Sequence, residues 1–433
     1  MTPGARVAAA IEVIADIEAR RRPAADALKD WGLSHRFAGS GDRAAIAGLA
    51  YDALRRRGSS AYIMGQESPR AVVLGMLRLE RKLDTEEIAR LADGARFSPP
   101  PLTDSERARL EAAEPTDAPP WVAGDYPKWL DPYLARAFGD ERAAEGAALA
   151  RRAPLDLRVN TLKAELEKAV QALAHLDAAP TRWSPLGLRI RLAADAKNPA
   201  IHAEPAFIKG LVEIQDEGSQ LAALLTDAKP GAQVVDLCAG AGGKTLALAA
   251  MMEDRGQVYA TDQDKRRLAP IHARLSRAGA HNIQVRTPRG QENLLGDLQS
   301  RADLVLIDAP CTGTGSWRRN PDAKWRVRPG ALELRVEQQA ELLDRAALLV
   351  KPGGRLAYVT CSILAEENAD QVRAFLVRRP EFSPVPPPKV TDALGGRALI
   401  FRQVALMAEE GLLMTPRRTD TDGFYVAVLR RGG

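Results

Sequence analysis

Residues 236–245 read DLCAGAGGKT, a glycine-rich turn between a short run of valine and leucine and a segment with helical patterning. Glycine lets the backbone come close to a ligand, and the first turn of a following helix offers free N–H groups. The span from Gly240 to Lys244 is too short for the phosphate-binding pattern GxxxxGK[ST], and the residues after Gly243 break the dinucleotide pattern GxGxxG. By itself, the turn predicts a ligand site open to NAD, phosphate or S-adenosylmethionine.

Similar apolar runs recur after this turn, in the segments GQVYATD, NIQVRT, ADLVLIDAP and GRLAYVTCS. Unbroken runs of Val, Leu and Ile suit parallel strands that are buried on both faces, and their alternation with helical segments predicts a doubly wound, Rossmann-like α/β sheet. In such sheets, ligands bind beyond the carboxyl ends of the strands. Three cysteines and three acids follow these runs, so we expect them in one site: Cys238, Cys311, Cys361, Asp236, Asp262 and Asp308.

The chain before the turn divides into two further regions. Val7, Ile11, Ile14 and Ile17 recur at three- and four-residue steps, and no strand-like alternation interrupts residues 5–95, which predicts an all-helical region. Within it, a helix over SGDRAAIAGLAYDALRRRG is expected to end at Gly58. A proline-rich segment at 97–121 and a mixed strand and helix pattern follow. We expect a helical domain with a linker at 1–115, a small α+β subdomain at 116–215 and an α/β domain at 216–433.

Composition excludes several classes of protein. Three cysteines cannot all pair, and no Cys-x-x-Cys or His-x-x-x-His spacing is present, so we expect neither disulfides nor a metal site. No apolar run approaches the roughly 18 residues of a membrane span, and the N-terminal segment is amphipathic, unlike a signal peptide; we expect a cytoplasmic protein. The net charge of +5 is modest, but arginines gather at 20–22, 55–57, 151–152 and 318–319, which favours an anionic partner.

Two cysteines beside a nucleoside site suggest a specific chemistry. An acid at the position of Asp262 can accept both hydroxyls of a ribose. Carbon 5 of cytosine is a poor nucleophile, but a thiolate that adds to carbon 6 makes carbon 5 reactive toward a methyl sulfonium, and a second cysteine can assist the later release. Asp308, held partly protonated by burial, is expected to hydrogen-bond the ring.

Six motifs in order resemble the Sun-type family of S-adenosylmethionine-dependent RNA cytosine-5 methyltransferases: RVNTLK, IQDEGSQL, DLCAGAGGKT, DAPCTGTGSWRRNPDAKW, VTCSILAEEN and TDGFYVAVL. They cover about residues 155–430. The resemblance implies that Cys361 is the nucleophile, that Cys311 aids product release and that Asp308 lies between cofactor and cytosine. Residues 40–58 more loosely resemble the NusB-like RNA-binding domain of the bacterial small-subunit rRNA branch, which favours 16S rRNA as substrate.

The resemblance also assigns binding residues. It implies cofactor contacts by Cys238, Ala239, Gly240, Ala241, Gly242, Gly243, Lys244, Asp262, Arg267 and Asp308. It implies RNA contacts by Arg158, Asn160, Arg318, Arg319, Asn320 and Lys324. We expect S-adenosylmethionine as cofactor, RNA as partner, no metal, no membrane and a monomer.

Two departures from the family pattern matter. The third motif usually presents an acid to the adenine, whereas QVRTPRGQENL offers Arg286, Pro288 and Arg289, with Gln291 or Asn293 as substitutes. The glycine turn also lacks the proline that many relatives place before its last two glycines. One alternative is a catalytically inert RNA-binding or ribosome-assembly factor on a methyltransferase scaffold, which the retained cysteines disfavour. The other is a nicotinamide dehydrogenase, which the broken GxGxxG pattern disfavours.

Overall fold

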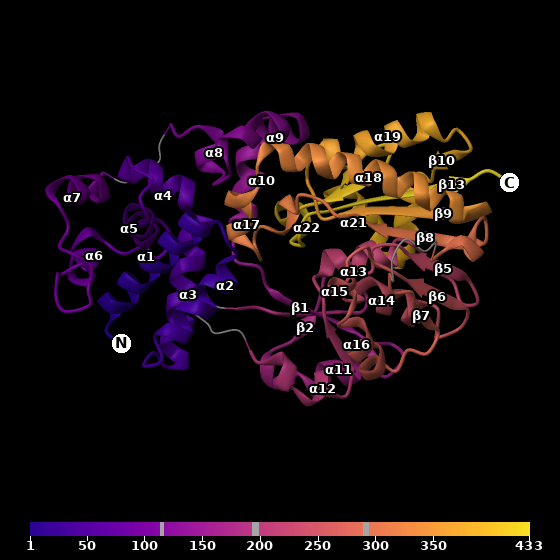
Figure 1. Ribbon diagram of the computed structural model, residues 1–433, viewed down its shortest axis with the longest axis horizontal. Helices are drawn as coiled ribbons and strands as arrows, with labels where there is room; N and C mark the ends of the chain where they lie inside the picture. Colours follow the sequence, from indigo (N-terminus) through magenta and orange to yellow (C-terminus); the bar gives the residue numbers. More distant parts are fainter. Residues whose placement is uncertain (113–116, 193–198, 289–293) are drawn as a thin grey trace. The chain divides into compact units, whose positions relative to one another are not determined.

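The computed structural model describes residues 1–112, 117–192, 199–288 and 294–433 (Figure 1). Its described residues group into two compact units. The first contains Met1–Arg152 together with Trp317–Arg328, and the second contains the rest. Three domains with boundaries at 115 and 215 stay a prediction. Among the residues described, no helix is long and apolar enough to cross a membrane.

The first unit is helical. Its first helix begins at Pro3, whose fixed backbone suits a first turn, and the Thr2 hydroxyl accepts a hydrogen bond from the Ala5 N–H at 3.2 Å. The predicted apolar face is confirmed: Val7, Ile14 and Ile17 are buried in the core of this unit. The helices are α1 (Pro3–Arg20), α2 (Ala24–Ser34), α3 (Ser40–Arg55), α4 (Arg57–Met64), α5 (Pro69–Leu79), α6 (Thr85–Leu91), α7 (Asp104–Glu111), α8 (Pro120–Ala123), α9 (Asp131–Phe138), α10 (Arg142–Leu149) and α17 (Pro321–Arg326).

The predicted helix end at Gly58 is wrong. Helix α3 ends at Arg55, and Gly58 lies inside α4. The glycine is there for packing, because a Cβ at Gly58 would lie 3.3 Å from an Asp125 carboxylate oxygen and 3.4 Å from the Trp325 ring. The arginines at 55–57 pair with acids of the same unit at 2.7 to 3.0 Å: Arg55 with Asp52, Arg56 with Glu80 and Arg57 with Glu18. This cluster therefore stabilises the helical unit.

The segment Trp317–Arg328 packs among these helices although it lies far along the chain. Lys324 is 1% exposed, and its ammonium donates to the Arg55 carbonyl at 3.1 Å. The Trp325 Nε1 donates to the Leu54 carbonyl at 2.6 Å. Burial lowers the pKa of Lys324 to about 7, and the Asp125 carboxylate counteracts that shift.

The contribution of Lys324 to stability is therefore expected to rise with pH between about 7 and 10.5, the pKa of an ordinary lysine. In this window the unfolded chain holds a proton at Lys324 that the folded chain lacks, so each pH unit favours the folded state by up to about 1.4 kcal/mol; below pH 7 this dependence vanishes. Urea denaturation at pH 7, 8 and 9 checks this against Lys324→Met, which should flatten the rise. Equal slopes for both proteins would contradict it.

The second unit contains two sheets. The smaller one has the order β2-β3-β1-β4, all antiparallel, with Arg158 of β1 opposite Glu213 of β4. The elements before the glycine turn are β1 (Leu155–Val159), α11 (Leu166–Ala172), β2 (Ala179–Pro180), β3 (Gly187–Ile190), α12 (Pro205–Ile208), β4 (Val212–Ile214) and α13 (Glu217–Leu224). The predicted mixture of strands and helix over this region is confirmed.

The larger sheet has the order β11-β12-β13-β9-β8-β5-β6-β7, with β10 paired to β13. The strands are β5 (Gln233–Asp236), β6 (Gln257–Ala260), β7 (Ile283–Val285), β8 (Ala302–Asp308), β9 (Val350–Thr360), β10 (Phe382–Pro384), β11 (Leu406–Met407), β12 (Leu412–Met414) and β13 (Phe424–Arg431). The five runs predicted as strands are β5 to β9, and they pair in parallel. The Rossmann-like fold class is confirmed.

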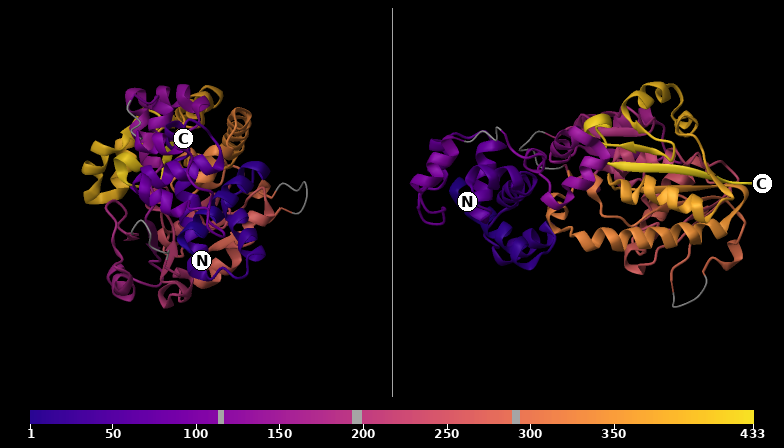
Figure 2. Two further views of the ribbon diagram at one scale, coloured as in Figure 1. Left: turned by 90° about the vertical axis from the view of Figure 1, so that its left-hand side faces the viewer. Right: turned by 90° about the horizontal axis from the view of Figure 1, so that it is seen from above.

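Helices cover both faces of this sheet. Val234 packs into a core with α13 and α14, while its neighbour Val235 packs into another with α18 and α19 (Figure 1). The long helix α18 runs along the strands in the right-hand view of Figure 2. The helices are α14 (Gly243–Met251), α15 (Lys265–Leu268), α16 (Ile271–Ala278), α18 (Pro329–Leu349), α19 (Ala369–Arg378), α20 (Pro387–Thr391), α21 (Ala398–Val404) and α22 (Pro416–Thr419).

The direction of strand addition reverses at β5, because β6 lies on one side of it and β8 on the other. At such a switch point the connections diverge to opposite faces and leave a crevice beyond the strand ends. The glycine turn follows β5, Asp308 ends β8 and Cys361 follows β9. The fold therefore gathers the predicted residues at one edge of the sheet.

Candidate active site

A cavity of about 300 Å³ lies beyond β5. Most of the residues predicted to bind a cofactor line it: Cys238, Ala239, Gly240, Ala241, Gly243, Lys244, Arg267 and Asp308. Four polar lining side chains, besides the apolar Ile214, were not predicted: Gln215, Asp216, Ser219 and Arg274. These four residues are far from the glycine turn in sequence. Gln215, Asp216 and Ser219 belong to the motif IQDEGSQL, but the residue types of this motif do not indicate a ligand site.

The glycine turn has a backbone that other residues adopt with difficulty. Gly242 has φ of 86°, and a Cβ there would lie 2.5 Å from the Ile271 side chain. The Gly240 N–H donates to Asp262 Oδ2 at 3.0 Å, and Arg267 Nη1 lies 3.8 Å from the same oxygen. Asp262, which is 4% exposed, thus shapes the turn, and its carboxylate retains acceptor capacity for a ligand hydroxyl.

Acids and one lysine set the charge of the cavity. Asp236 is 1% exposed, accepts a hydrogen bond from the Thr245 hydroxyl at 2.7 Å, and has its pKa raised to about 7 by burial. Lys244 Nζ lies 2.7 Å from Asp308 Oδ2. The Asp308 side chain is 34% exposed, so the burial on which its expected partial protonation depends is incomplete.

Two of the three cysteines meet. The sulfurs of Cys311 and Cys361 lie 3.3 Å apart, and both residues are half-buried. The hydrogen bond with Cys361, together with burial, raises the pKa of Cys311 well above its ordinary value. A Cys311 that keeps its proton can donate to the neighbouring sulfur and stabilise negative charge on it. Cys238 is buried and its pKa is raised, so it lines the cavity as an unreactive thiol.

The two cysteine loops are held against each other by hydrogen bonds. The Gly315 N–H donates to the Cys361 carbonyl at 2.9 Å, and the Ile363 N–H donates to the Thr314 hydroxyl at 2.9 Å. Thr314 and Ser362 also share a hydroxyl hydrogen bond at 3.1 Å. These contacts fix the separation of the sulfurs.

Gly315→Ala is expected to destabilise this arrangement. The added Cβ would lie 2.2 Å from the Gly423 carbonyl oxygen, so one of the crossing backbones must move. We expect a loss of about 2–3 kcal/mol in unfolding free energy and a displaced Cys311. Denaturation midpoints check this against Gly330→Ala, whose Cβ meets nothing within 4 Å. Identical midpoints for the two variants would show that the crossing tolerates a methyl group.

A buried carboxylate positions the Cys311 loop, and the sequence reasoning assigned it no role. Glu367 is fully buried and accepts hydrogen bonds from the Thr312 N–H at 2.8 Å and from Gln339 Nε2 at 3.0 Å. The backbone carbonyl of Glu367 also accepts a hydrogen bond from the Tyr358 hydroxyl at 2.7 Å. The only feature of the sequence that could have indicated this role is the place of Glu367 in the motif VTCSILAEEN. Two adjacent glutamates there look like residues exposed to solvent.

The residues predicted to contact RNA are mostly buried. Arg158, Asn160, Arg318 and Lys324 are each at most 3% exposed. Both amide protons of Asn160 are used, by the Gly210 and Ala278 carbonyls at 2.9 and 2.8 Å. A direct RNA contact by these four is at odds with their burial, and we do not propose it. Arg319 is half-buried and Asn320 is exposed, so both keep surface for such a contact.

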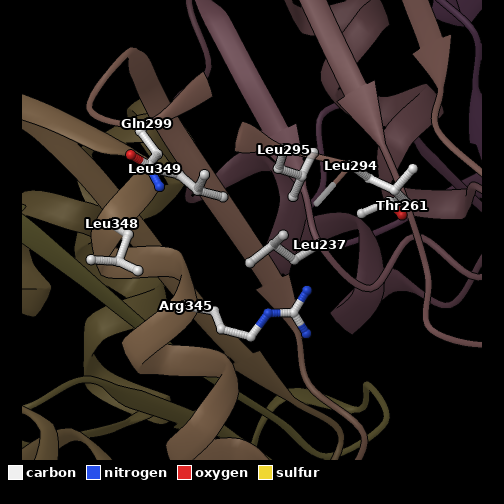
Figure 3. Close-up of a pocket in the computed structure, with 8 residues that line it drawn as sticks. All are labelled: Leu237, Thr261, Leu294, Leu295, Gln299, Arg345, Leu348 and Leu349. Carbon is white, nitrogen blue, oxygen red and sulfur yellow. The ribbon is translucent and has the colours of Figure 1, made fainter. Parts of the chain in front are cut away.

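The replacement for the third-motif acid can be followed only in part, since Arg289, Gln291 and Asn293 lie outside the described residues. Arg286 donates to Asp297 and to the Leu294 carbonyl, and it stacks on the Tyr259 ring. A second cavity of about 250 Å³ lies near these residues, with leucines and the Arg345 guanidinium around it (Figure 3). Nowhere in the described chain do three or more His, Cys, Asp or Glu side chains gather as a metal site.

Comparisons with known proteins identify the family of the chain. A family model described as "16S rRNA methyltransferase RsmB/F" matches residues 223–430, and one described as "Methyltr_RsmF/B-like, ferredoxin-like domain" matches 126–197. The probable ribosomal RNA small subunit methyltransferase B of Synechocystis sp. is 31% identical over 307 residues, 71% of this chain and 67% of the relative. The ribosomal RNA small subunit methyltransferase B of Vibrio vulnificus is 32% identical over 317 residues, with the same two coverages.

Solved structures show the same fold. PH0851 is similar with a TM-score of 0.71 and 27% identity, over 100% of this chain and 99% of that one. A methyltransferase homolog protein from Pyrococcus horikoshii follows with a TM-score of 0.59 and 26% identity, over 73% of this chain and 99% of its own. The paired cysteines and the motifs already pointed to this group. The chain belongs to the RsmB/F family of 16S rRNA methyltransferases.

Proposed function

We propose that the protein transfers a methyl group from S-adenosylmethionine to carbon 5 of a cytosine in 16S ribosomal RNA, through a covalent adduct with Cys361. The observation that carries this proposal is the pair of thiols 3.3 Å apart at the strand ends, beside a cavity with a glycine turn. The names of the relatives, which are ribosomal RNA small subunit methyltransferases, support the substrate. A cytoplasmic monomer stays a prediction.

The residues that line the cavity, together with Asp262, which accepts from the N–H of the lining residue Gly240, fit the proposed cofactor. Asp262 offers a carboxylate for the ribose hydroxyls, with Arg267 beside it. The glycine turn leads into α14, whose first N–H groups have no side-chain cap. Gly240, Gly243 and Lys244 line the space in which the amino-acid end would lie. When bound, the cofactor supplies an electrophilic methyl group.

The protein residues then perform the following steps. The Cys361 sulfur adds to carbon 6 of the cytosine, and the Asp308 carboxylate is proposed to accept a hydrogen bond from the exocyclic amine. The addition places electron density on carbon 5, which takes the methyl group. Solvent water, acting as the base, takes the carbon 5 proton; this re-forms the ring double bond and expels the Cys361 thiolate, which the protonated Cys311 stabilises by a hydrogen bond from 3.3 Å away.

An accessible cytosine is expected, since a base inside a duplex must first be unstacked at a cost of a few kcal/mol. Incubation of the protein with the small ribosomal subunit or its RNA and isotopically labelled cofactor, followed by nucleoside analysis, tests the function. The proposal expects label in 5-methylcytidine, and bisulfite mapping of the same RNA should place the modified base in a loop. Label in another nucleoside would contradict the cytosine assignment, and RNA binding without any label would favour the inert assembly factor.

A further inference from the structure

One wall of the cofactor cavity has no role in the proposed chemistry. It contains Gln215, Asp216 and Ser219, at the end of β4 and the start of α13. Gln215 is 7% exposed, so its amide is held in the protein and presents little surface except toward the cavity. A buried amide at a ligand cavity is either a packing element or a donor of fixed direction.

The direction of the Gln215 amide is set by Arg158. The guanidinium has only donors, so the oxygen Oε1 must face it, and Arg158 Nε lies 2.7 Å from that oxygen. The backbone of Gln215 is fixed as well, because its N–H donates to the Asp156 carbonyl at 3.1 Å. The nitrogen Nε2 is therefore forced away from Arg158, and it donates one proton to the Ser219 hydroxyl at 3.1 Å.

The second Nε2 proton has no acceptor among the described atoms, and it lies beside the start of α14. A Cβ built on Gly243 would be 3.9 Å from Gln215 Nε2 and 3.9 Å from Arg274 Nη2. Gly243 is the first residue of α14, whose N-cap, Gly242, provides no side-chain oxygen for the free N–H groups. Backbone and side-chain donors thus converge on one end of the cavity.

The charges around this end suit an amino acid. Arg274 neutralises the buried Glu213 at 3.0 Å and donates to the Ala241 carbonyl at 2.9 Å, so it braces the turn. Asp216, next to Gln215 in the same wall, already accepts hydrogen bonds from the Gly218 N–H at 2.8 Å and the Asp422 N–H at 3.2 Å, so it favours an ammonium through its negative charge. A donor cluster beside an acid fits a zwitterion better than a simple anion.

We propose that Gln215, held in orientation by Arg158, donates to the α-carboxylate of the cofactor's amino-acid end. Gln215 is the binding residue, and Arg158 is a positioning residue that does not touch the ligand. This inference rests on the proposed function, because it assumes that the cavity holds S-adenosylmethionine. The proposal gives Arg158 of the motif RVNTLK and Gln215 of the motif IQDEGSQL a shared role in cofactor binding. An RNA contact by Arg158 would not explain this contact between the two motifs.

Binding of two ligands to the Gln215→Glu variant tests the proposal by isothermal titration: S-adenosylmethionine and its decarboxylated form, which lacks only the carboxylate. Glutamate still accepts from Arg158, so the variant is expected to fold, but it turns an oxygen toward the carboxylate. We expect S-adenosylmethionine to bind about tenfold or more weakly, and the decarboxylated form to bind as in the wild type. Arg158→Met should show the same selective loss, because the amide is then free to turn over.

Gln338→Glu is the matched control, since Gln338 Oε1 also accepts from an arginine, Arg335 Nη1, at a distance of 2.7 Å. Neither residue lines the cofactor cavity. This variant should leave both affinities unchanged. Equal weakening of both ligands by Gln215→Glu, or no weakening, would overturn the inference while the proposed function stands. Failure of the wild type to bind either ligand would overturn both together. Thermal melting of each variant separates a lost contact from a lost fold.

Discussion

The Cys311→Ala variant is expected to accumulate a covalent protein–RNA complex in the presence of S-adenosylmethionine, whereas Cys361→Ala should form none. In the proposed mechanism the adduct needs only the Cys361 sulfur, and its breakdown needs the thiol that lies 3.3 Å away. Removing the nucleophile should lower methyl transfer by at least about a thousandfold, which corresponds to roughly 4 kcal/mol in the barrier. A denaturing protein gel detects the complex as an RNase-sensitive band of reduced mobility.

The third cysteine provides the control for this experiment. Cys238 is buried, and its raised pKa keeps it a thiol, so Cys238→Ala retains both reacting sulfurs and should show no persistent band. If Cys361→Ala traps RNA and Cys311→Ala does not, the two cysteines have the opposite roles. Absence of any band, with RNA binding retained, would favour the inert assembly factor. The trapped RNA also identifies its own target by sequencing.

Sequence patterns predicted the parallel part of the large sheet because each strand is a compact apolar run with a chemically distinct residue at its end. Val235 and Asp236 illustrate this. Val235 is apolar because it is buried in the core, and Asp236 ends β5 at the edge of the sheet where ligands bind. In the sequence, the antiparallel strands β11 to β13 lack this combination of an apolar run and a chemically distinct residue at its end. The segment TDGFYVAVL was quoted as a motif, yet its pairing with β9 depends on contacts such as Ala427 with Tyr358, which lie far apart in the chain.

The burial and the partners of the charged residues could not be predicted from the sequence. Lys324 follows a run of arginines, where solvation is the ordinary expectation, but α17 buries it among the helices of the first unit. Arg158 likewise looks like a surface cation on a strand, and only the structure reveals Gln215 as its partner. Local patterns report how often a residue type is exposed; they do not report which distant carbonyl or carboxylate compensates for burial.

The Lys244–Asp308 ion pair is the second feature with a large expected effect. Lys244 is 7% exposed, its Nζ lies 2.7 Å from Asp308 Oδ2 and 4.9 Å from the centre of the Phe424 ring. Asp236 is close enough that the negative charge of Asp308 helps to raise its pKa and the charge of Lys244 opposes this. One ammonium therefore balances two acids at the strand ends.

Lys244→Met is expected to lower methyl transfer by about a hundredfold, since Asp308 then lacks its counter-ion and the pKa of Asp236 rises further. Asp308→Asn should cost a similar factor, because it removes the carboxylate proposed to bind the cytosine. The pair is partly open to solvent, so a contribution from attraction alone would be small. The larger effect is expected because both groups line the cavity in which the cofactor is proposed to bind. Single-turnover rates with saturating cofactor measure it.

The double variant distinguishes a functional pair from two independent groups. If Lys244 acts mainly by holding the Asp308 side chain in place, Lys244→Met combined with Asp308→Asn should be no slower than the slower single variant. Independent contributions would instead multiply to about ten-thousandfold, and that result would mean that Lys244 contacts cofactor or RNA on its own account. Lys351→Met serves as the matched control, because Lys351 pairs with Asp303 at the other end of β8, and its loss should leave the rate unchanged.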